Sequence, residues 1–461
     1  MKNQTKTTLT FLGDLMCNKK LIALSKTPSG DYDFTPSFAN VKPYLTNSAY
    51  VIGNLETPID SKRGNAFTPR EKGFNSPPEY VEAAADAGVD LFLTGNNHCY
   101  DHECEKGLLT TLKMLDSYHL EHTGTYATKE DSEKLFIREV NGIKIAFLNY
   151  TFGINYNVHG NLLPKEKGYQ INFLVPPEYH ELEDWWNLFP FLLKHRLPDG
   201  FHKFLLHTKK TYSYQEFTQK IQNDISAAKE QGAECIVLLP HFGIECITRP
   251  LRFQRKWCEM MFKAGADIII GGHPHTLQPM EFREIEDRFG ASKKRFLIYS
   301  LGNFISQEVS YCPHDLSTMS VILNVHLERS QKTGMVEITS ADCIPTWIHA
   351  ASPDKPVAVH VLPDEIKAAH ANNDTVLEKK LIGIQKRIHS IITASENTSA
   401  HLSWEFLPDS DVQHKERWIY PQDVKYLFTG FPMQVFGTAY SVFIPEKLRV
   451  RISKMRGTYK P

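Results

Sequence analysis

The chain reads IIIGGHPH over residues 268–275, and this stretch predicts both a fold and a site. Three consecutive isoleucines are typical of a strand that is buried on both faces, as in a parallel sheet. A pair of glycines ends the run, and His273 and His275 follow directly. Ligands of open α/β sheets gather beyond the carboxyl ends of the strands. We therefore expect this strand to deliver two imidazoles to the edge of a sheet.

Four other short apolar runs end on side chains that bind metals. Residues 11–12 lead to Asp14, 51–52 to Glu56, 91–93 to Asn97 and His98, and 236–239 to His241. Parallel strands place their carboxyl ends at one edge, so we expect these side chains to meet there. The chain thus predicts a cluster of two carboxylates, one Asn and four His.

Helical patterns that close on Gly and lead into apolar strands occur three times. Helices over 80–88, 217–232 and 252–265 are followed by strands over 89–93, 235–239 and 267–270. This order indicates parallel strands joined by helical crossovers. Runs at 143–150 and 295–300 add strands, whereas 320–327 and 336–339 alternate as half-buried antiparallel strands do. The predicted fold class is α/β with mixed sheets.

Residues 1–345 are expected to form one domain, and residues 346–461 a C-terminal extension packed on it. A long insertion over 155–215 is expected to cover the rim of the site, and a surface loop without a role there is the alternative. Within the extension, residues 374–393 carry apolar side chains at helical spacing. This spacing favours a packing face rather than a cofactor site.

The composition is that of an ordinary soluble globular protein. The 461 residues include 52 Lys and Arg against 53 Asp and Glu, for a formal net charge of -1. This balance lacks the basic footprint of a nucleic-acid binder. No apolar stretch approaches the roughly 20 residues that span a bilayer. The eight cysteines form no CxxC pair, and Cys235 and Cys258 lie in apolar settings that favour buried core thiols.

The start of the chain bears on its location. Residues 1–6 resemble the beginning of a signal peptide, but the apolar segment after them is short and contains Asp14. We therefore expect a soluble, cytoplasmic protein, and a cell-envelope location only if a longer precursor lost a leader.

The donor types in the predicted cluster indicate which metals it would hold. Carboxylate, amide and imidazole donors without thiolate suit Mn, Fe or catalytic Zn rather than a structural zinc. We expect one or two divalent metal ions, since a carboxylate such as Glu56 can bridge a pair. A metal lowers the pKa of its bound water, so no Ser or Cys nucleophile is required. The chain has neither a G-x-S-x-G elbow nor a Walker-type phosphate loop.

Six motifs together resemble the CapA/PgsA family of poly-γ-glutamate capsule-synthesis proteins. They are Gly13-Asp14, Gly53-Asn54-Leu55-Glu56, Asn96-Asn97-His98, His241-Phe242-Gly243-Ile244-Glu245, Gly272-His273-Pro274-His275 and Ser300-Leu301-Gly302-Asn303-Phe304. Their order and spacing match over about residues 7–310. That family resembles the calcineurin-like metallophosphoesterases. The resemblance implies a β-sandwich flanked by helices and a dimetal centre at strand-end loops.

The resemblance also implies a role for each matching residue. His98 would be catalytic, either protonating the leaving group or steadying the substrate oxyanion. The metal ligands would be Asp14 and His275 for one ion, Glu56 as the bridge, and Asn97, His241 and His273 for the second ion. The residues expected to orient these groups or contact substrate are Asn54, Asn96, Asp101, Glu245 and Asn303.

Two positions depart from the metallophosphoesterase pattern. Met16 stands where those enzymes usually have a His two residues after the first Asp, and Glu56 replaces a bridging Asp. A site in which one of the metals is weakly held, or a mononuclear site, would follow from these changes.

The expected function is that of a CapA-like protein of poly-γ-glutamate or envelope-polymer metabolism. We expect a metal-dependent hydrolase of γ-glutamyl amide or related bonds. A metal-dependent phosphoesterase and a non-catalytic capsule-assembly factor are the alternatives. The expected partners are an anionic polymer or small-molecule substrate and capsule-synthesis proteins, without nucleic acid.

Overall fold

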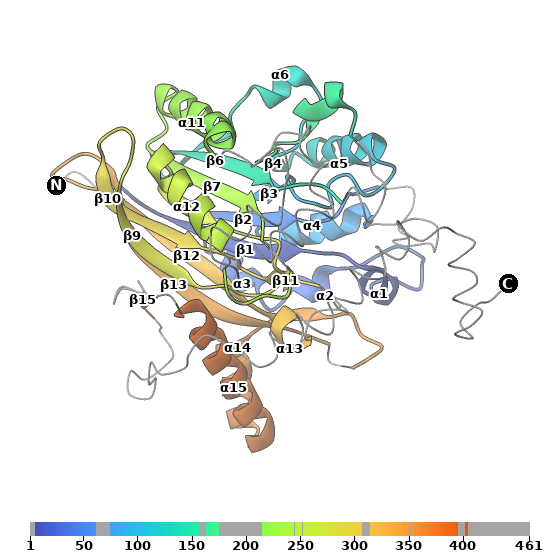
Figure 1. The fold of residues 1–461 in the computed structure, drawn as a ribbon. Helices are drawn as coiled ribbons and strands as arrows, with labels where there is room; N and C mark the ends of the chain where they lie inside the picture. Colours follow the sequence, from blue (N-terminus) through green and yellow to red (C-terminus); the bar gives the residue numbers. More distant parts are fainter. Residues whose placement is uncertain are drawn as a thin grey trace, which may run out of the picture. The chain divides into compact units, whose positions relative to one another are not determined.

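Two β-sheets lie face to face in the computed structural model of the chain, with helices on the outer side of each (Figure 1). The structure describes residues 5–60, 74–155, 163–174, 214–243, 245–250, 252–306, 314–350, 352–394 and 402–403. All of them belong to a unit spanning Met1–Pro408, and a second unit is Asp409–Pro461. Most of the insertion predicted over 155–215 lies outside the described residues, as do residues 1–4.

The first sheet has nine strands in the order β14-β13-β12-β1-β2-β3-β4, with β11 beside β1 and β15 beside β13. Strands β1 to β4 are parallel to one another, and β12, β13 and β14 continue the sheet in antiparallel fashion. The bounds are β1 (Lys6–Leu15), β2 (Tyr50–Leu55), β3 (Leu91–Leu93), β4 (Glu121–Thr123), β11 (Asn303–Ile305), β12 (Met319–Arg329), β13 (Val336–His349), β14 (Ala358–Val361) and β15 (Leu402–Ser403).

The second sheet has six strands in the order β5-β6-β7-β8-β10-β9. Its four inner strands are parallel, and the edge strands β5 and β9 are antiparallel to their neighbours. The bounds are β5 (Ile137–Val140), β6 (Ile143–Thr151), β7 (Cys235–His241), β8 (Ile268–Ile270), β9 (Met280–Glu286) and β10 (Ser292–Ile298). The prediction of an α/β fold with mixed sheets is confirmed.

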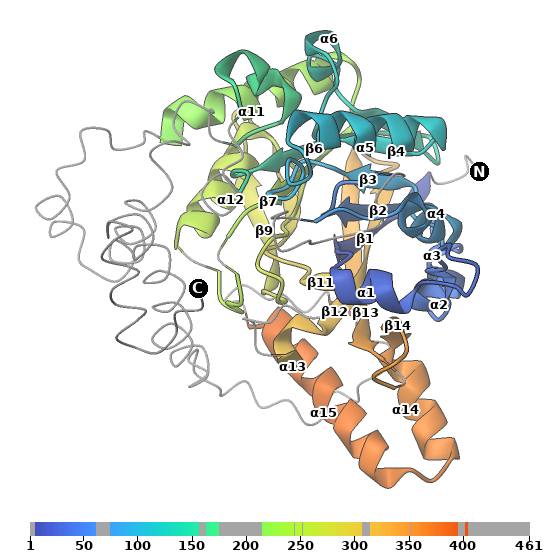
Figure 2. The same ribbon diagram turned by 90° about the vertical axis from the view of Figure 1, so that its right-hand side faces the viewer.

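Helices cover the outer face of each sheet. Figure 2 shows α11 and α12 beside the second sheet and α2, α3 and α4 on the opposite side, beside the first. The bounds are α1 (Lys19–Leu24), α2 (Thr35–Phe38), α3 (Lys42–Leu45), α4 (Pro78–Asp86), α5 (Glu105–Ser117), α6 (Lys129–Ser132), η1 (Lys165–Gln170), α11 (Tyr214–Glu230), α12 (Arg252–Ala264), α13 (His314–Ser317), α14 (Leu362–Ala371) and α15 (Thr375–Ile392). The predicted β-sandwich flanked by helices is therefore confirmed.

Alternation along β2 shows why its sequence is apolar without a break. Tyr50 and Ile52 point into the core between the two sheets, whereas Val51 points into the core beneath the outer helices. A strand that is covered on both faces must be apolar at every position. The same arrangement holds for β7, where Val237 faces the other sheet and Leu238 faces the helices.

The predicted helix–Gly–strand units are confirmed. Helices α4, α11 and α12 end just before Gly88, Gly232 and Gly265, whose φ angles are 114°, 89° and 117°. Glycine adopts this left-handed conformation without steric cost, so it can end a helix and turn the chain into the next strand. The helix predicted over 374–393 is α15, and its Leu381 and Ile388 are fully buried in the core between the sheets.

Strand β13 is much longer than the alternation at 336–339 predicts. It pairs with β12 along its length and continues through Pro345 to His349. Proline usually interrupts strand patterns, so the residues around Pro345 do not predict a continuation of this strand. Pairing with a long partner strand decided its length instead.

Two cysteines agree with a further expectation. Cys235 and Cys258 are free and buried, and burial raises the pKa of Cys235 well above its usual value. Cys246, by contrast, is disulfide-bonded. Within the described residues, no helix is both long and apolar enough to cross a membrane.

Candidate metal centre

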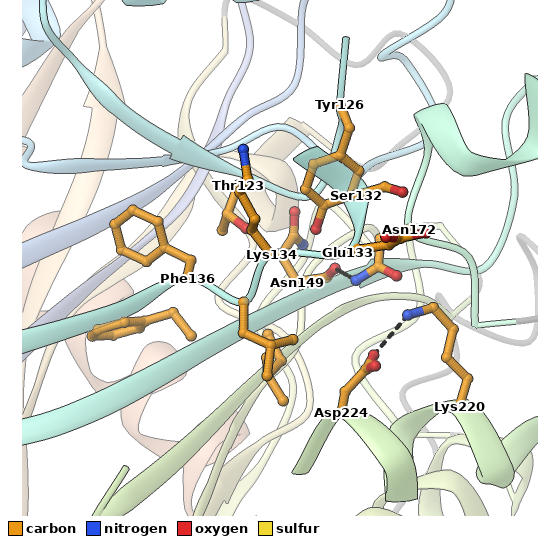
Figure 3. Close-up of a pocket in the computed structure, with 13 residues that line it drawn as sticks. Thr123, Tyr126, Ser132, Glu133, Lys134, Phe136, Asn149, Asn172, Lys220 and Asp224 are labelled. Carbon is orange, nitrogen blue, oxygen red and sulfur yellow. Dashed lines mark hydrogen bonds and ion pairs between the residues drawn. The ribbon is translucent and has the colours of Figure 1, made fainter. Parts of the chain in front are cut away.

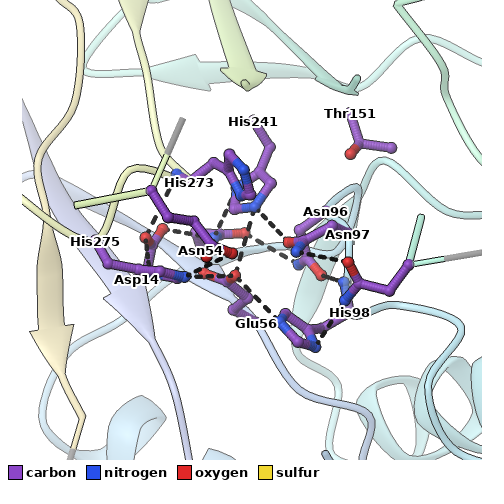
Figure 4. Close-up of polar contacts among 12 residues, drawn as sticks. Asp14, Asn54, Glu56, Asn96, Asn97, His98, Thr151, His241, His273 and His275 are labelled. Atoms are coloured by element: carbon purple, nitrogen blue, oxygen red, sulfur yellow. Dashed lines mark hydrogen bonds and ion pairs between the residues drawn. The ribbon is translucent and has the colours of Figure 1, made fainter. Parts of the chain in front are cut away.

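The six predicted metal ligands converge on one buried place, where carboxyl ends of strands from both sheets meet (Figure 4). Strands β1, β2 and β3 of the first sheet bring three of them, and β7 and β8 of the second sheet bring the others. The site is therefore shared between two sheets rather than lying on the edge of one. The ligands are Asp14, Glu56, Asn97, His241, His273 and His275.

Close backbone contacts bring β1 and β8 to this place. A Cβ atom at Gly13 would lie 2.1 Å from the carbonyl oxygen of Gly302, and one at Gly271 would lie 2.0 Å from that of Tyr299. Only glycine allows such approaches, since any side chain would overlap the neighbouring backbone. The Gly residues of the two motifs thus let the ligand-bearing turns lie against the end of β10 and the loop that follows it.

The turn that carries His273 and His275 has an uncommon backbone. Their φ angles are 95° and 56°, in the left-handed region that non-glycine residues seldom adopt. A hydrogen bond from the backbone N–H of Cys246 to the carbonyl of Pro274, 2.7 Å long, supports the turn. Backbone strain of this kind clusters at functional sites, where surrounding contacts maintain it. It lets both imidazoles face the carboxylates.

Glu56 lies at the middle of the cluster. Its Oε1 is 3.5 Å from His241 Nε2, 3.8 Å from His275 Nε2 and 3.9 Å from His98 Nε2. The oxygen is buried and accepts no hydrogen bond, and the buried His275 Nε2 and His273 Nδ1 also have no hydrogen-bond partner. Buried polar atoms almost always have partners, so three orphans in one place call for an explanation.

Two overlapping triads could each hold a cation. One comprises Asp14, Glu56 and His241, and the other Glu56, His273 and His275, with the donor atoms of each triad within 4.8 Å of one another. Glu56 belongs to both, as a bridging carboxylate would. The structure groups His241 with Asp14, and His273 with His275. The family pattern instead assigns His275 to the ion of Asp14, and His241 and His273 to the ion of Asn97.

The charges of the cluster are strongly perturbed. Burial, together with the nearby Asp14 and Glu245 carboxylates, raises the pKa of Glu56 well above its usual value. Burial also lowers the pKa of His241 to about 3 and takes the pKa of His273 well below its usual value. A neutral imidazole is the form that binds a metal, so these histidines are ready to act as ligands.

Asp14 and His275 form a coupled pair. Burial alone would raise the pKa of Asp14, but the hydrogen bond from His275 and the field of His241 outweigh it and lower this pKa to about 2. Burial opposes a charge on His275 as well, yet the hydrogen bond to Asp14 and its negative charge raise the pKa of His275. Asp14 is thus a charged carboxylate inside the protein, 3.4 Å from His275 Nδ1.

A divalent cation fits these residues. The three buried atoms without a hydrogen-bond partner, Glu56 Oε1, His275 Nε2 and His273 Nδ1, would serve as its ligands. The charge of the cation would favour the ionised form of Glu56. Carboxylate, imidazole and amide donors without thiolate match Mn, Fe or catalytic Zn. The chemistry of the donors and the unpartnered atoms therefore agree with each other.

Asn54 connects the members of the cluster. Its Nδ2 donates a 2.7 Å hydrogen bond to Asp14 Oδ1 and lies 3.4 Å from Glu56 Oε2 and 3.3 Å from His241 Nδ1. Its Oδ1 accepts a 3.1 Å hydrogen bond from Asn96 Nδ2, which also bonds to the carbonyl of Leu55. The two asparagines that were predicted to support the site thus lie between its ligands.

His98 borders the cluster and has its own partners. Its Nδ1 is 2.5 Å from Asp101 Oδ2, and its ring lies 4.5 Å from that of Phe74, edge to face. The side chain is 12% exposed, whereas the carboxylate of Glu56 is fully buried. Its Nε2 is therefore the ring nitrogen that faces the cluster.

Asn155 was missed at the sequence level. Its Oδ1 accepts a 3.2 Å hydrogen bond from Asn97 Nδ2, and its Nδ2 is 3.3 Å from His98 Nδ1. It follows β6 at the start of the predicted insertion, where no motif marks it. Only its position after a strand, which it shares with the other site residues, could have drawn attention to it.

Asn303 and Glu245 lie on the His275 side. Asn303 Nδ2 donates to the carbonyl of Ser317, so its Oδ1 is free to accept a 3.0 Å hydrogen bond from His275 Nδ1. This bond leaves the lone pair of a neutral His275 on Nε2, facing Glu56. Glu245 Oε1 is 4.0 Å from the same Nε2, and its side chain is 31% exposed.

A cavity of about 310 Å³ lies elsewhere on the second sheet. Figure 3 shows Tyr126, Asn149, Asn172, Lys220 and Asp224 around it. None of the six predicted metal ligands lines it, so it is distinct from the metal cluster.

Comparisons with known proteins show the family of the chain. The family model described as "Bacterial capsule synthesis protein PGA_cap" matches residues 8–308. The chain is 26% identical to "Capsule biosynthesis protein CapA" of Bacillus anthracis over 358 residues, which is 77% of this chain and 71% of that protein. It is also 26% identical to "PGA biosynthesis protein CapA" of Bacillus subtilis (strain 168) over 344 residues, 74% of this chain and 72% of that protein.

Among solved structures, the chain is similar to the calcineurin-like phosphoesterase YfkN from Bacillus subtilis, with a TM-score of 0.36 and 13% sequence identity over 82% of this chain and 99% of that one. The family model covers all six motifs that carry the predicted resemblance, which is confirmed. The chain therefore belongs to the bacterial capsule synthesis protein family PGA_cap.

Proposed function

We propose that this chain is a metal-dependent hydrolase of γ-glutamyl amide or related bonds in poly-γ-glutamate or a similar envelope polymer. The substrate class is suggested by the family and by the name of its B. subtilis relative, a PGA biosynthesis protein. The observation that carries the hydrolytic part is the buried, unpartnered Oε1 of Glu56 with His241 Nε2 and His275 Nε2 within 3.8 Å.

The residues that would hold the metals are those of the two triads together with Asn97, whose Oδ1 is 2.7 Å from His241 Nε2. When bound, divalent ions supply a water of lowered pKa and polarise the scissile carbonyl group. Asn54 links Asp14 and Glu56, because its Nδ2 donates to Asp14 Oδ1 at 2.7 Å and lies 3.4 Å from Glu56 Oε2. Asn303 keeps His275 in the orientation in which Nε2 faces the cluster.

His98 is suited to protonate the departing amine. Asp101 Oδ2 accepts a hydrogen bond from His98 Nδ1 across 2.5 Å, which fixes the orientation of the ring. Nε2 then points toward Glu56, 3.9 Å away, on the side where a substrate would meet the metals. In amide hydrolysis, a proton donated from His98 Nε2 to the amide nitrogen converts the poor leaving group into a free amine.

Elemental analysis tests the metal part. Wild-type protein purified in Mn²⁺- and Zn²⁺-supplemented buffer is expected to retain one or two equivalents, and Asp14→Ala and His275→Ala to lose most of them. His370→Ala is a matched control, because His370 is exposed and also contacts a carboxylate, at 3.0 Å in Glu378. Metal-free wild-type protein would instead favour a non-catalytic assembly factor.

A turnover assay tests the substrate. Release of glutamate or shorter chains from poly-γ-glutamate, abolished in His98→Ala, is the expected result. The same site could act on phosphate esters, so an aryl phosphate is assayed in parallel. Turnover of the aryl phosphate alone, lost in the same variant, would replace the amidase with a phosphoesterase.

A further inference from the structure

Asn149 connects two site-bearing loops through a single buried carboxamide. It lies in β6 and is 2% exposed. Its Oδ1 accepts a 2.7 Å hydrogen bond from the N–H of Gly95, and its Nδ2 donates to the carbonyls of Gly95, at 3.2 Å, and Leu239, at 2.8 Å. Every donor of the amide group is thus used. If the carboxamide were flipped, its NH2 group would face the N–H of Gly95 and its oxygen would face the two carbonyls. The orientation of the amide is therefore fixed.

The two segments that Asn149 joins both carry predicted metal ligands. Gly95 precedes Asn97 by two residues, and Leu239 precedes His241 by two residues. The Gly95 loop follows β3 of the first sheet, whereas β6 and β7 belong to the second. The side chain therefore bridges the sheets close to the site. Across this bridge, Asn97 Oδ1 and His241 Nε2 are 2.7 Å apart.

The surrounding chain leaves room for this carboxamide. A Cβ atom at Gly95 would lie 2.7 Å from Asn149 Oδ1, and one at Gly124 only 2.0 Å from it. Asn172 donates a 2.7 Å hydrogen bond to the backbone carbonyl of Asn149, which holds the strand at this point. Figure 3 shows Asn149 and Asn172 side by side at the wall of the 310 Å³ cavity.

We infer that Asn149 is a positioning residue of the metal centre, which sets the separation of Asn97 Oδ1 and His241 Nε2 so that both reach the same cation. This inference rests on the proposed function, because it assigns Asn149 to the same centre. A buried asparagine that only satisfies backbone groups would stabilise the fold equally with and without metal. The two roles differ in how a substitution changes metal affinity.

The test compares Asn149→Leu, which removes all three hydrogen bonds, with wild-type protein. The control is Asn324→Leu, because Asn324 also bonds through both ends of its amide, to Thr10 and Asp342. Melting temperatures are measured in chelator and at increasing Mn²⁺ concentrations. The rise in melting temperature on adding Mn²⁺ depends on the Mn²⁺ dissociation constant. Only a substitution that alters the metal site should therefore change this rise.

We expect the Mn²⁺ dissociation constant to increase about tenfold or more in Asn149→Leu and to stay at the wild-type value in Asn324→Leu. Asn149→Asp is the second variant if the first does not fold. It keeps the acceptor for Gly95 N–H but places a carboxylate against two carbonyls, so it is also expected to weaken binding. An unchanged metal-induced rise in the Asn149 variants would overturn the inference.

A second measurement separates this inference from the proposed function. Hydrogen exchange of the peptide that contains residues 95–98 is followed in chelator, where no metal contributes. We expect faster exchange in the Asn149 variants than in Asn324→Leu, and equal exchange would overturn the inference. If wild-type protein shows no metal-induced rise, the proposed function is wrong, and the exchange result still decides whether Asn149 holds this loop.

Discussion

Asn54→Leu is expected to destabilise the metal-free protein more than any matched substitution outside the site. Leucine has a similar size, so the change mainly removes hydrogen bonds. Asn54 is buried and donates a 2.7 Å bond to the carboxylate of Asp14, which is itself fully buried. It also accepts a 3.1 Å bond from Asn96 Nδ2, which donates in addition to the carbonyl of Leu55.

The size of the effect follows from these two bonds. A hydrogen bond to a charged group contributes about 1.5–3 kcal/mol and a neutral one about 1 kcal/mol. The contacts to Glu56 and His241, at 3.4 and 3.3 Å, are long and add little. We therefore expect the free energy of unfolding to fall by about 3 kcal/mol. The buried Asp14 charge loses its best donor, and water cannot replace it.

Urea denaturation in the presence of chelator measures this loss. Asn324→Leu is the control, because Asn324 has the same pattern of one carboxylate and one neutral partner but is only half-buried. Its expected loss is about 1 kcal/mol, since water can solvate the groups it leaves. Losses for the two variants that agree within error would refute the reasoning. With metal present, Asn54→Leu should also weaken binding, since Asn54 orients two ligands.

Three other outcomes follow from the structure. Gly271→Ala would place a Cβ 2.0 Å from a backbone oxygen, so the free energy of unfolding should fall by about 3 kcal/mol or more. Gly290 has open space around it, so Gly290→Ala should lower this free energy by about 1 kcal/mol. Urea denaturation measures both changes. Leu381→Ala should cost about 2–5 kcal/mol because Leu381 is fully buried, and Val376→Ala, 81% exposed, should change stability by less than about 0.5 kcal/mol. The pKa of Asp14, about 2, lies below its unfolded value, so Asp14 contributes stability above about pH 4 that is lost as the pH falls toward 2. Titration of unfolding in chelator should show this loss in wild-type protein but not in Asp14→Asn.

The local sequence predicted most of the helices and strands and which polar side chains stand at the ends of strands. Apolar spacing and a Gly after the last turn predict helices α4, α11 and α12, and both signals depend only on neighbouring residues. Apolar runs that end on His, Asn or a carboxylate predicted where each ligand would lie on its strand. These features could be read without the fold, because parallel strands deliver their carboxyl ends to a common side.

Local sequence patterns thus specify which residues stand at strand ends, whereas the packing of the two sheets specifies how these residues meet. Apolar alternation indicates that one face of a strand is buried, but it does not indicate which element covers that face. The division of the five strands with predicted ligands between two facing sheets could therefore not be predicted. The contacts of Asn54 with His241, and of Asn149 with Gly95, join residues 187 and 54 positions apart. Such contacts leave no periodic signal, because they form only when the packing of both sheets brings the backbones together.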